Sequence, residues 1–262
     1  MGFSHAAHSA QGKAPESVSG GGEAGEFSVS TSLDIFSQYV FRGVASNKGG
    51  AVIEPSVSLG YKGLSFSVWG NLDANPANGL KNWTETDVVL SYSHNLTKNL
   101  DVRGGAIYYF LENASNDAIE VFGGATYHFP WFNVSFTAYK EVTYYPGWWL
   151  QLDVNRTIPL PYYGMSLFLD ARFGYQILYG NNNLLNTSPI EYGNFSDLQS
   201  GLVMAALNIP FKNIPSVNIF YVTPVIGVAY PLSSAGSHYI AANSVDNQDT
   251  HIFGGVSLLV RF

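Results

Sequence analysis

The sequence predicts an all-β protein, a transmembrane antiparallel up-and-down β-barrel of about 12 strands. Three observations predict this fold. Apolar and polar residues alternate in successive runs, and the connections between runs alternate in length. Charged residues are only 12% of the 262 residues and aromatic residues reach 15%, whereas soluble domains carry roughly 25% charged residues. Such a chain is expected to expose an apolar surface to lipid.

The first predicted strand, residues 27–42, displays the alternation. Side chains along a strand point to opposite faces with a period of two. One face is apolar and comprises Phe27, Val29, Thr31, Leu33, Ile35, Tyr39 and Phe41, and the polar face comprises Ser28, Ser30, Ser32, Asp34, Gln38 and Arg42. The same pattern predicts further strands over residues 50–61, 64–72, 84–94, 100–110, 118–128, 132–141, 148–157, 165–177, 196–208, 217–229 and 251–262.

The connections fall into two classes that alternate along the chain. The short class is rich in Pro, Gly and Asn, which favour turns, and covers residues 62–63, 95–99, 129–131, 158–164 and 209–216. The long class includes residues 73–83, 178–194 and 230–250. Bacterial outer-membrane barrels have short periplasmic turns and longer external loops. A soluble β-sandwich is the alternative, because its strands alternate as well.

Aromatic residues gather where the predicted strands end, as in the girdles that position a barrel in a bilayer. Near the short turns they are Tyr61, Tyr92, Tyr127, Phe129, Trp131, Tyr162 and Tyr163, and near the long loops Tyr108, Phe110, Tyr144, Tyr145, Trp148, Tyr175 and Tyr179. No run approaches the ~18 apolar residues of a membrane helix. Strands are therefore the elements expected to meet outer-membrane lipid.

The two ends of the chain carry separate expectations. Residues 1–26 include a Gly- and Ser-rich stretch and are expected to form a flexible segment, a processed signal remnant or linker, before a barrel domain over residues 27–262. The last strand is expected to pair with the first and remove both sheet edges. Its ending resembles the signal by which bacterial barrels are recognised by the barrel assembly machinery, carried here by Gly254, Leu258, Val260 and Phe262.

A family resemblance covers the first quarter of the chain. The stretch from residue 33 to residue 75 contains a Tyr-x-Phe-Arg-Gly element and a later Trp-Gly pair, formed by Tyr39, Phe41, Arg42, Gly43, Trp69 and Gly70. In these features the chain resembles the TorF family of porin-like proteins, although Gln38 stands where that family's pattern has Asp. The resemblance implies an outer-membrane barrel of a Gram-negative bacterium and implies no catalytic residue or substrate.

Several functions find no support in the residues. The net charge of −7 and the scattered Lys and Arg argue against a nucleic-acid partner. Without cysteine there is no disulfide or thiolate metal site, and the six histidines have no zinc-site spacing. No Gly-x-Ser-x-Gly element is present, and no His and Ser align on an outward face as a lipid hydrolase requires. We expect no cofactor and no catalytic residue.

The polar faces predict the residues that line the lumen. The acidic ones are Asp34, Glu54, Glu85, Asp87, Asp101, Glu120, Glu141, Asp153 and Asp170, and the basic ones are Arg42, Arg103, Arg172 and Arg261. The excess of acids favours cations. Inward aromatic residues could stack ring-bearing solutes or fill space, and are predicted to be Phe36, Tyr109, Phe122, Tyr139, Trp149, Phe168, Phe220 and Phe253.

These residues favour a channel for passive diffusion of small-molecule solutes, with a possible preference for cations. The alternative is a closed structural or adhesive barrel in which acids and arginines pair into a network and the long loops face a partner. A lipid-acting enzyme is the minor alternative. A barrel of about 12 strands is narrower than the 16–18-stranded porins, so its side chains leave a small opening or none.

Overall fold

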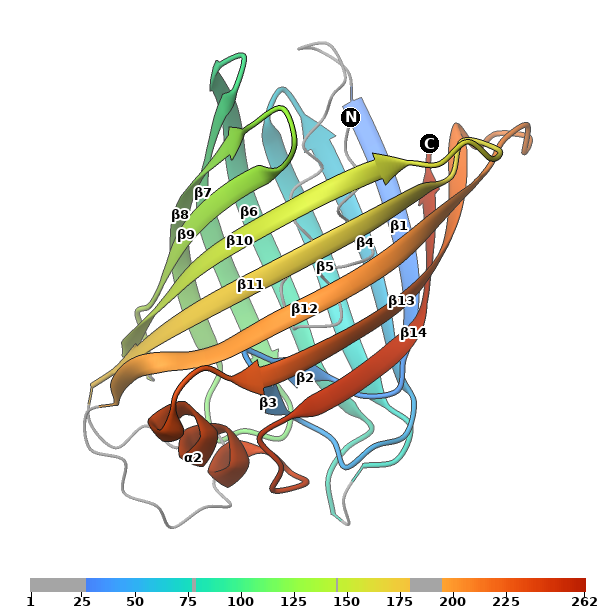
Figure 1. The fold of residues 1–262 in the computed structure, drawn as a ribbon. Coiled ribbons are helices and arrows are strands. Elements are labelled where there is room, and N and C mark those ends of the chain that lie inside the picture. Colours follow the sequence, from blue (N-terminus) through green and yellow to red (C-terminus); the bar gives the residue numbers. More distant parts are fainter. Residues whose placement is uncertain (1–26, 77–78, 145, 180–194) are drawn as a thin grey trace.

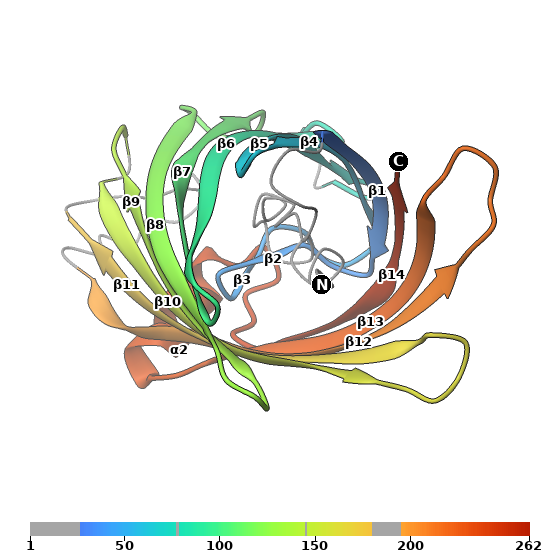
Figure 2. The same cartoon turned by 90° about the horizontal axis from the view of Figure 1, so that it is seen from above.

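The computed structural model describes residues 27–76, 79–144, 146–179 and 195–262. Within these residues, 12 strands close into an antiparallel barrel, confirming the predicted fold class (Figures 1 and 2). The strands are β1 (Phe27–Phe36), β4 (Val52–Tyr61), β5 (Leu64–Asp73), β6 (Trp83–Thr97), β7 (Leu100–Leu111), β8 (Ala118–His128), β9 (Asn133–Glu141), β10 (Gly147–Pro159), β11 (Ser166–Leu178), β12 (Ser196–Phe211), β13 (Ile219–Pro231) and β14 (His251–Arg261).

The barrel closes as the sequence predicts, between its first and last strands. Antiparallel pairing of β1 with β14 runs from Ser30 opposite Arg261 to Phe36 opposite Gly255. On its other side, β1 pairs with β4 along its whole length, from Phe27 to Phe36. Both edges of the sheet are thereby removed, which satisfies the backbone groups that an open edge would leave unpaired.

The exterior of the barrel is its apolar face. Along the strands, exposed apolar side chains alternate with buried inward-facing side chains. In β11, Leu169 and Phe173 are exposed, while Asp170 and Arg172 are buried. Aromatic residues stand exposed at both rims, including Trp131 and Tyr163 near the short turns and Tyr144 near the long loops. A soluble sandwich buries its apolar face, so this inside-out arrangement excludes that alternative.

The connections alternate between the two rims as predicted, but length does not separate them fully, because residues 112–117 and 142–146 at the long-loop rim are fewer than residues 212–218 at the short-turn rim. β1 begins and β14 ends at the rim that holds the short turns, such as Lys62–Gly63 between β4 and β5 (Figure 1). The longer connections lie at the opposite rim, where residues 232–250 contain the helix α2 (Ser234–Asn243). The predicted loop over 178–194 falls almost wholly outside the described residues, as do residues 1–26, so the division of the chain at residue 27 stays a prediction.

The first predicted strand, 27–42, is wrong beyond residue 36. There the chain leaves the wall and enters the lumen as a small hairpin of β2 (Val40–Phe41) and β3 (Val44–Ala45), visible across the interior in Figure 2. Tyr39 and Phe41 therefore do not face outward; Tyr39 is 2% exposed. The alternating pattern continues through this segment because the hairpin strands also alternate, so periodicity alone does not reveal the exit.

An apolar cluster occupies the interior beside the hairpin. It combines inward side chains of β1, β4, β5 and β11–β14 with those of the hairpin segment, and comprises Phe36, Tyr39, Val40, Val52, Trp69, Phe168, Leu202, Met204, Ala206, Val225, Ala229 and Phe253. One predicted inward aromatic is wrong: Phe220 lies opposite Val260 on the outward face, because Tyr221 and Thr223 are the buried positions of β13. Among the described residues, no helix is long and apolar enough to cross a membrane.

Candidate functional site

The hairpin turn places one arginine inside the lumen, near β8, β9 and β10. The turn residues Arg42 and Gly43 have φ angles of 51° and 88°, and two central residues with positive φ are typical of the type I′ turns that join two-residue hairpins. Gly43 lies against β12, where an added Cβ would be 2.6 Å from the Cβ of Ser200. The turn therefore needs glycine for both its conformation and its close approach to the wall.

Arg42 crosses to β8 and forms a two-point ion pair there. Its two terminal nitrogens donate to the two carboxylate oxygens of Glu120 at 2.7 Å each. Its guanidinium also lies 4.6 Å from the ring centre of Phe41 and 5.2 Å from those of Tyr139 and Trp149. Burial lowers the pKa of Arg42, but Glu120 more than compensates and leaves this pKa above its usual value. The group is a permanent cation.

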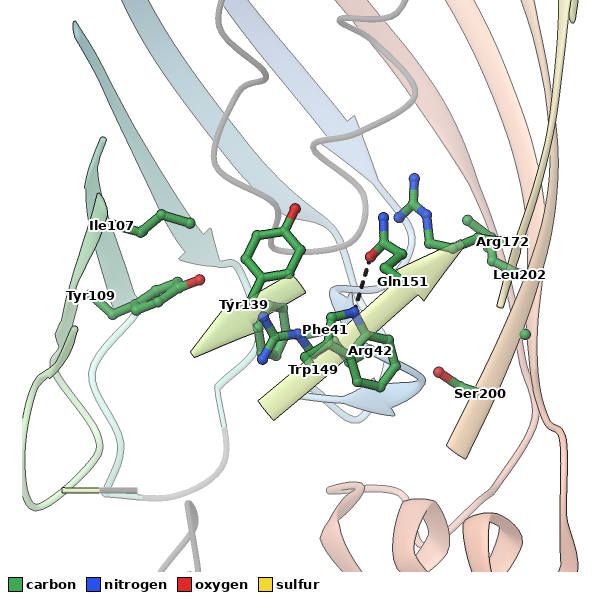
Figure 3. Close-up of a pocket in the computed structure, with 11 residues that line it drawn as sticks. Phe41, Arg42, Ile107, Tyr109, Tyr139, Trp149, Gln151, Arg172, Ser200 and Leu202 are labelled. Carbon is green, nitrogen blue, oxygen red and sulfur yellow. Dashed lines mark hydrogen bonds between the residues drawn. The ribbon is translucent and has the colours of Figure 1, made fainter. Parts of the chain in front are cut away.

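A small cavity adjoins this arginine (Figure 3). Tyr139, Trp149 and Gln151 from β9 and β10 face Arg42 across it, and the indole N–H of Trp149 donates to the Gln151 side-chain carbonyl at 3.0 Å. Arg172 on β11 also lines the cavity. The cavity is lined by aromatic rings, an amide and two arginines. Both arginines are paired with carboxylates, so the charge around the cavity is balanced.

Arg172 belongs to a second buried ion-pair group on β10 and β11. Its Nε donates to Asp153 at 2.6 Å and one terminal nitrogen donates to Asp170 at 3.2 Å. Gln151 donates to both oxygens of Asp153, at 3.0 and 2.9 Å. Together with Arg42 and Glu120, these charges form what we call the paired wall: Glu120, Asp153 and Asp170 with Arg42 and Arg172.

A second group of buried carboxylates lies on other strands of the barrel. We call Asp34, Glu54, Glu85 and Asp87 the acidic wall; they come from β1, β4 and β6, and Asp34 lies directly opposite Glu54 in the strand register. All four are buried. No cationic side chain of the described residues contacts Glu54 or Asp87; the Trp69 indole lies beside Glu54, and Glu85 lies beside Asp87.

Tyr39 links the hairpin segment to the acidic wall. Its hydroxyl donates to Glu85 at 2.9 Å, and its ring centre is 5.6 Å from that of Trp69. Burial, reinforced by Glu85, Asp87 and Glu54, raises the pKa of Tyr39 well above its usual value. Tyr39 therefore stays a neutral hydrogen-bond donor.

The hairpin is tied to the long connection that contains α2. The backbone N–H of Ala45 donates to the Ser244 hydroxyl at 3.1 Å, and the N–H of Val245 donates to the Ala45 carbonyl at 3.0 Å. The side chain of Gln199 donates to the Arg42 carbonyl at 2.8 Å. The hairpin is thus fixed at its tip and at its C-terminal strand.

Sequence reasoning missed a Ser, His and Asp arrangement at this junction. His251 Nε2 lies 3.3 Å from the Ser244 hydroxyl, and its Nδ1 lies 3.4 Å from an Asp246 oxygen. Ser244 and His251 are both buried, at 4% and 2% exposure. Because Ser244 also accepts the hydrogen bond from the hairpin, the geometry is that of an anchor. Ser244 and His251 lie only seven positions apart in the sequence.

The predicted lumen residues occupy inward positions, with different surroundings. Arg42 reaches the lumen from the hairpin and not from the wall. At the short-turn rim, Asp101 lies 2.7 Å from His128, and Arg103 donates to Thr137 at 3.1 Å. Arg261 lies near the end of β14 and is partly buried. Their role in selectivity stays a proposal. Across the described residues, no three His, Asp or Glu side chains converge as metal ligands.

Comparisons with known proteins give a general result. No protein-family model matches the chain, and no curated protein matches it. Solved structures do match. The NanC porin structure shares 12% identity over 90% of this chain and 99% of that one, with a TM-score of 0.47. The likeness is one of fold.

Two further structures are similar to the chain at lower TM-scores. A loop-deletion mutant of OmpT, an outer membrane protein of Vibrio cholerae, shares 9% identity over 92% of this chain and 100% of that one, at a TM-score of 0.37. A refined porin structure shares 11% identity over 90% and 99%, at 0.32. The fold assignment itself rests on the strand pairing described above.

Proposed function

We propose that the chain forms a bacterial outer-membrane channel for passive diffusion of small solutes, with a preference for cations. The apolar exterior, the aromatic rims and the closed strand order supply what a barrel in lipid requires. The acidic wall is the observation that carries the preference. Among the described residues no cation pairs with Glu54 or Asp87, so this wall carries excess negative charge, whose field favours cations in the lumen.

The paired wall supports the same proposal from the other side. Arg42 and Arg172 are each held by carboxylates within 3.2 Å, which neutralises the cations that would otherwise repel entering positive charge. The lumen is therefore asymmetric, with balanced charge on one wall and excess negative charge on the other. Diffusion needs only such polarity and width, so neither a cofactor nor a nucleophile takes part.

The experiment is a single-channel recording in a planar lipid bilayer with a KCl gradient. Discrete current steps with a reversal potential displaced toward the potassium equilibrium value support the proposal. A displacement toward the chloride value overturns the cation preference. Silence from barrels whose folding has been verified by circular dichroism and heat-modified mobility overturns the channel.

A closed barrel that displays its external loops is the second candidate. The observation that favours it is the hairpin β2–β3, which lies in the lumen and packs into the apolar cluster of the interior. α2 and the connections beside it would then be the displayed surface. Silent, folded barrels in the recording above are the result that this candidate predicts.

Enzyme activity is the minor candidate, because the Ser244 and His251 side chains are within hydrogen-bond reach. Their burial leaves no space for an ester at the Ser244 hydroxyl, and we propose that the chain is not an enzyme. Hydrolysis of detergent-solubilised phospholipid that disappears in a Ser244→Ala variant is the result that would reverse this.

The residues that resemble the TorF family have structural roles in or near the hairpin. Membership of that family stays a prediction. Arg42 and Gly43 form the hairpin turn, and Tyr39 and Trp69 stand together beside the acidic wall. Gly70 faces the Trp83 ring, where an added Cβ would come within 2.2 Å of a ring carbon. The element therefore encodes an inward hairpin and its contact surface.

A further inference from the structure

The hairpin β2–β3 is not hydrogen-bonded into the wall of the barrel. Among the described residues, its two strands pair with each other in a sheet that is separate from the closed barrel. An isolated two-stranded hairpin is marginally stable at best in water, yet Val40 and Ala45 of this hairpin are 0% exposed. Contacts with other segments therefore hold the hairpin in its place across the lumen (Figure 2).

The connection that follows α2 holds both ends of the hairpin. Where the chain enters the hairpin, the Gln38 side chain donates to an Asp246 carboxylate oxygen at 3.0 Å. Where the chain leaves it, the backbone N–H of Ala45 donates to the Ser244 hydroxyl at 3.1 Å, and the N–H of Val245 donates to the Ala45 carbonyl at 3.0 Å. Consecutive residues of one connection thus bind the entry and the exit of the hairpin.

His251 joins these two attachments to each other. Its Nε2 lies 3.3 Å from the Ser244 hydroxyl, and its Nδ1 lies 3.4 Å from an Asp246 carboxylate oxygen. Because His251 is the first residue of β14, it also links the group to the wall. We call Ser244, Val245, Asp246 and His251 the clasp.

The helix α2 packs on the same hairpin. Val44 of β3 lies against a buried cluster that includes Tyr239 of α2. Ile240, also in α2, is 0% exposed, and a Cβ added at Gly43 would be 3.1 Å from the end of its side chain. α2 and the clasp belong to one connection, so this connection and the hairpin form one packed unit at the long-loop rim (Figure 1).

We infer that the clasp keeps the hairpin in the lumen, and that release of the clasp displaces the hairpin and widens the channel. The inference rests on the proposed channel function and makes the connection after α2 the segment that controls conductance. The strands that flank the hairpin, β1 and β4, meet it at the long-loop rim, so a displaced hairpin moves toward that rim.

The tip of the hairpin opposes the same displacement. There Arg42 pairs with Glu120, and Gln199 donates to the Arg42 carbonyl. Each contact adds to the free-energy difference between the hairpin in the lumen and the displaced hairpin. Loss of one clasp hydrogen bond therefore raises the displaced population without abolishing the inward state.

The first test is chemical labelling of a Val40→Cys barrel. The chain contains no cysteine, so the new thiol is the sole target. Because the side chain at position 40 is buried while the hairpin is in the lumen, aminoethyl methanethiosulfonate should react slowly, at a rate set by the displaced population. Adding Ser244→Ala or Asp246→Ala should speed the reaction about tenfold, the effect of losing one buried hydrogen bond of about 1.4 kcal/mol.

The second test is single-channel recording of the clasp variants with Val40 retained. Ser244→Ala and Asp246→Ala channels are expected to occupy a larger current level about tenfold more often than wild type, in line with the labelling. Ser237→Ala and Asp249→Ala are the matched controls, because these two side chains lie in the same connection and hydrogen-bond to each other at 2.6 Å. Both controls should keep the wild-type labelling rate and currents.

The outcomes separate the clasp from the channel. Equal labelling of clasp variants and controls overturns the inference, and so does faster labelling with wild-type currents, while the channel stands in both cases. If every folded variant is silent, the proposed function fails and labelling alone decides the clasp: a faster reaction supports it and an unchanged rate overturns it. If the Val40→Cys barrel does not fold by circular dichroism, the currents decide, and wild-type currents in both clasp variants overturn the inference.

Discussion

The paired wall and the acidic wall contain the same side-chain type at similar burial, yet they differ in what satisfies it. Asp153 and Asp170 are held by Arg172 at 2.6 and 3.2 Å. Glu54 and Asp87 have no such partner among the described residues. The difference indicates that carboxylates on the first wall fix structure, whereas in the proposed channel those on the second supply an excess of negative charge. Substitutions on the two walls should therefore have opposite effects on stability.

The largest expected effect is on the paired wall. Arg172→Met keeps much of the side-chain volume but leaves Asp153 and Asp170 buried without their cation, which typically costs about 3–5 kcal/mol in the free energy of unfolding. Urea unfolding of the refolded barrel in lipid vesicles measures this loss. Arg156→Met is the control, since Arg156 is exposed on the outward face. An equal cost for both variants would remove the distinction between the walls.

The next effect concerns the hairpin that carries Arg42 to the paired wall. Gly43→Ala places a side chain at φ 88° and 2.6 Å from the Ser200 Cβ. The backbone conformation alone costs about 1–2 kcal/mol, and the contact adds to it. Gly49→Ala has a similar φ of 98° with nothing within 4 Å. We expect Gly43→Ala to be the more destabilising in the same urea assay; equal losses would show that the contact with β12 is unimportant.

On the acidic wall, the expected change in the free energy of unfolding has the opposite sign. Glu54→Gln removes an unpaired buried charge and keeps the side-chain shape, so the free energy of unfolding should rise by about 1 kcal/mol. Glu120→Gln, the same change in a carboxylate bound by Arg42, should lower it. The midpoints of urea unfolding, compared between variants whose unfolding free energy depends equally on urea concentration, measure both changes. A loss of stability in Glu54→Gln would mean that Glu54 has a structural partner.

The smallest effect lies outside both walls. Lys81 and Glu112 form an ion pair on the external connections, with side chains 66% and 40% exposed. Exposed pairs contribute little because water and salt screen them. Lys81→Ala should change the free energy of unfolding by less than about 0.5 kcal/mol, and a larger loss would indicate that the connection is more rigid than its exposure suggests.

The barrel was predictable because each strand obeys one local rule, a period of two between an apolar and a polar face. The hairpin was not, since Tyr39 and Phe41 continue the same alternation after the chain has left the wall. The Arg42–Gly43 pair between short apolar stretches was the available signal for a turn. Which carboxylates are paired was also beyond the sequence: Glu120 meets Arg42 across 78 positions, and only the closed barrel brings them together.

The most direct test of the proposed cation selectivity is the reversal potential of a Glu54→Gln, Asp87→Asn double variant in a planar bilayer under a KCl gradient. We expect discrete current steps whose reversal potential moves from the cation-selective wild-type value toward zero, while Glu112→Gln channels keep the wild-type value. A double variant that retains the full wild-type reversal potential would contradict the claim that the unpaired carboxylates of the acidic wall set the selectivity of the lumen.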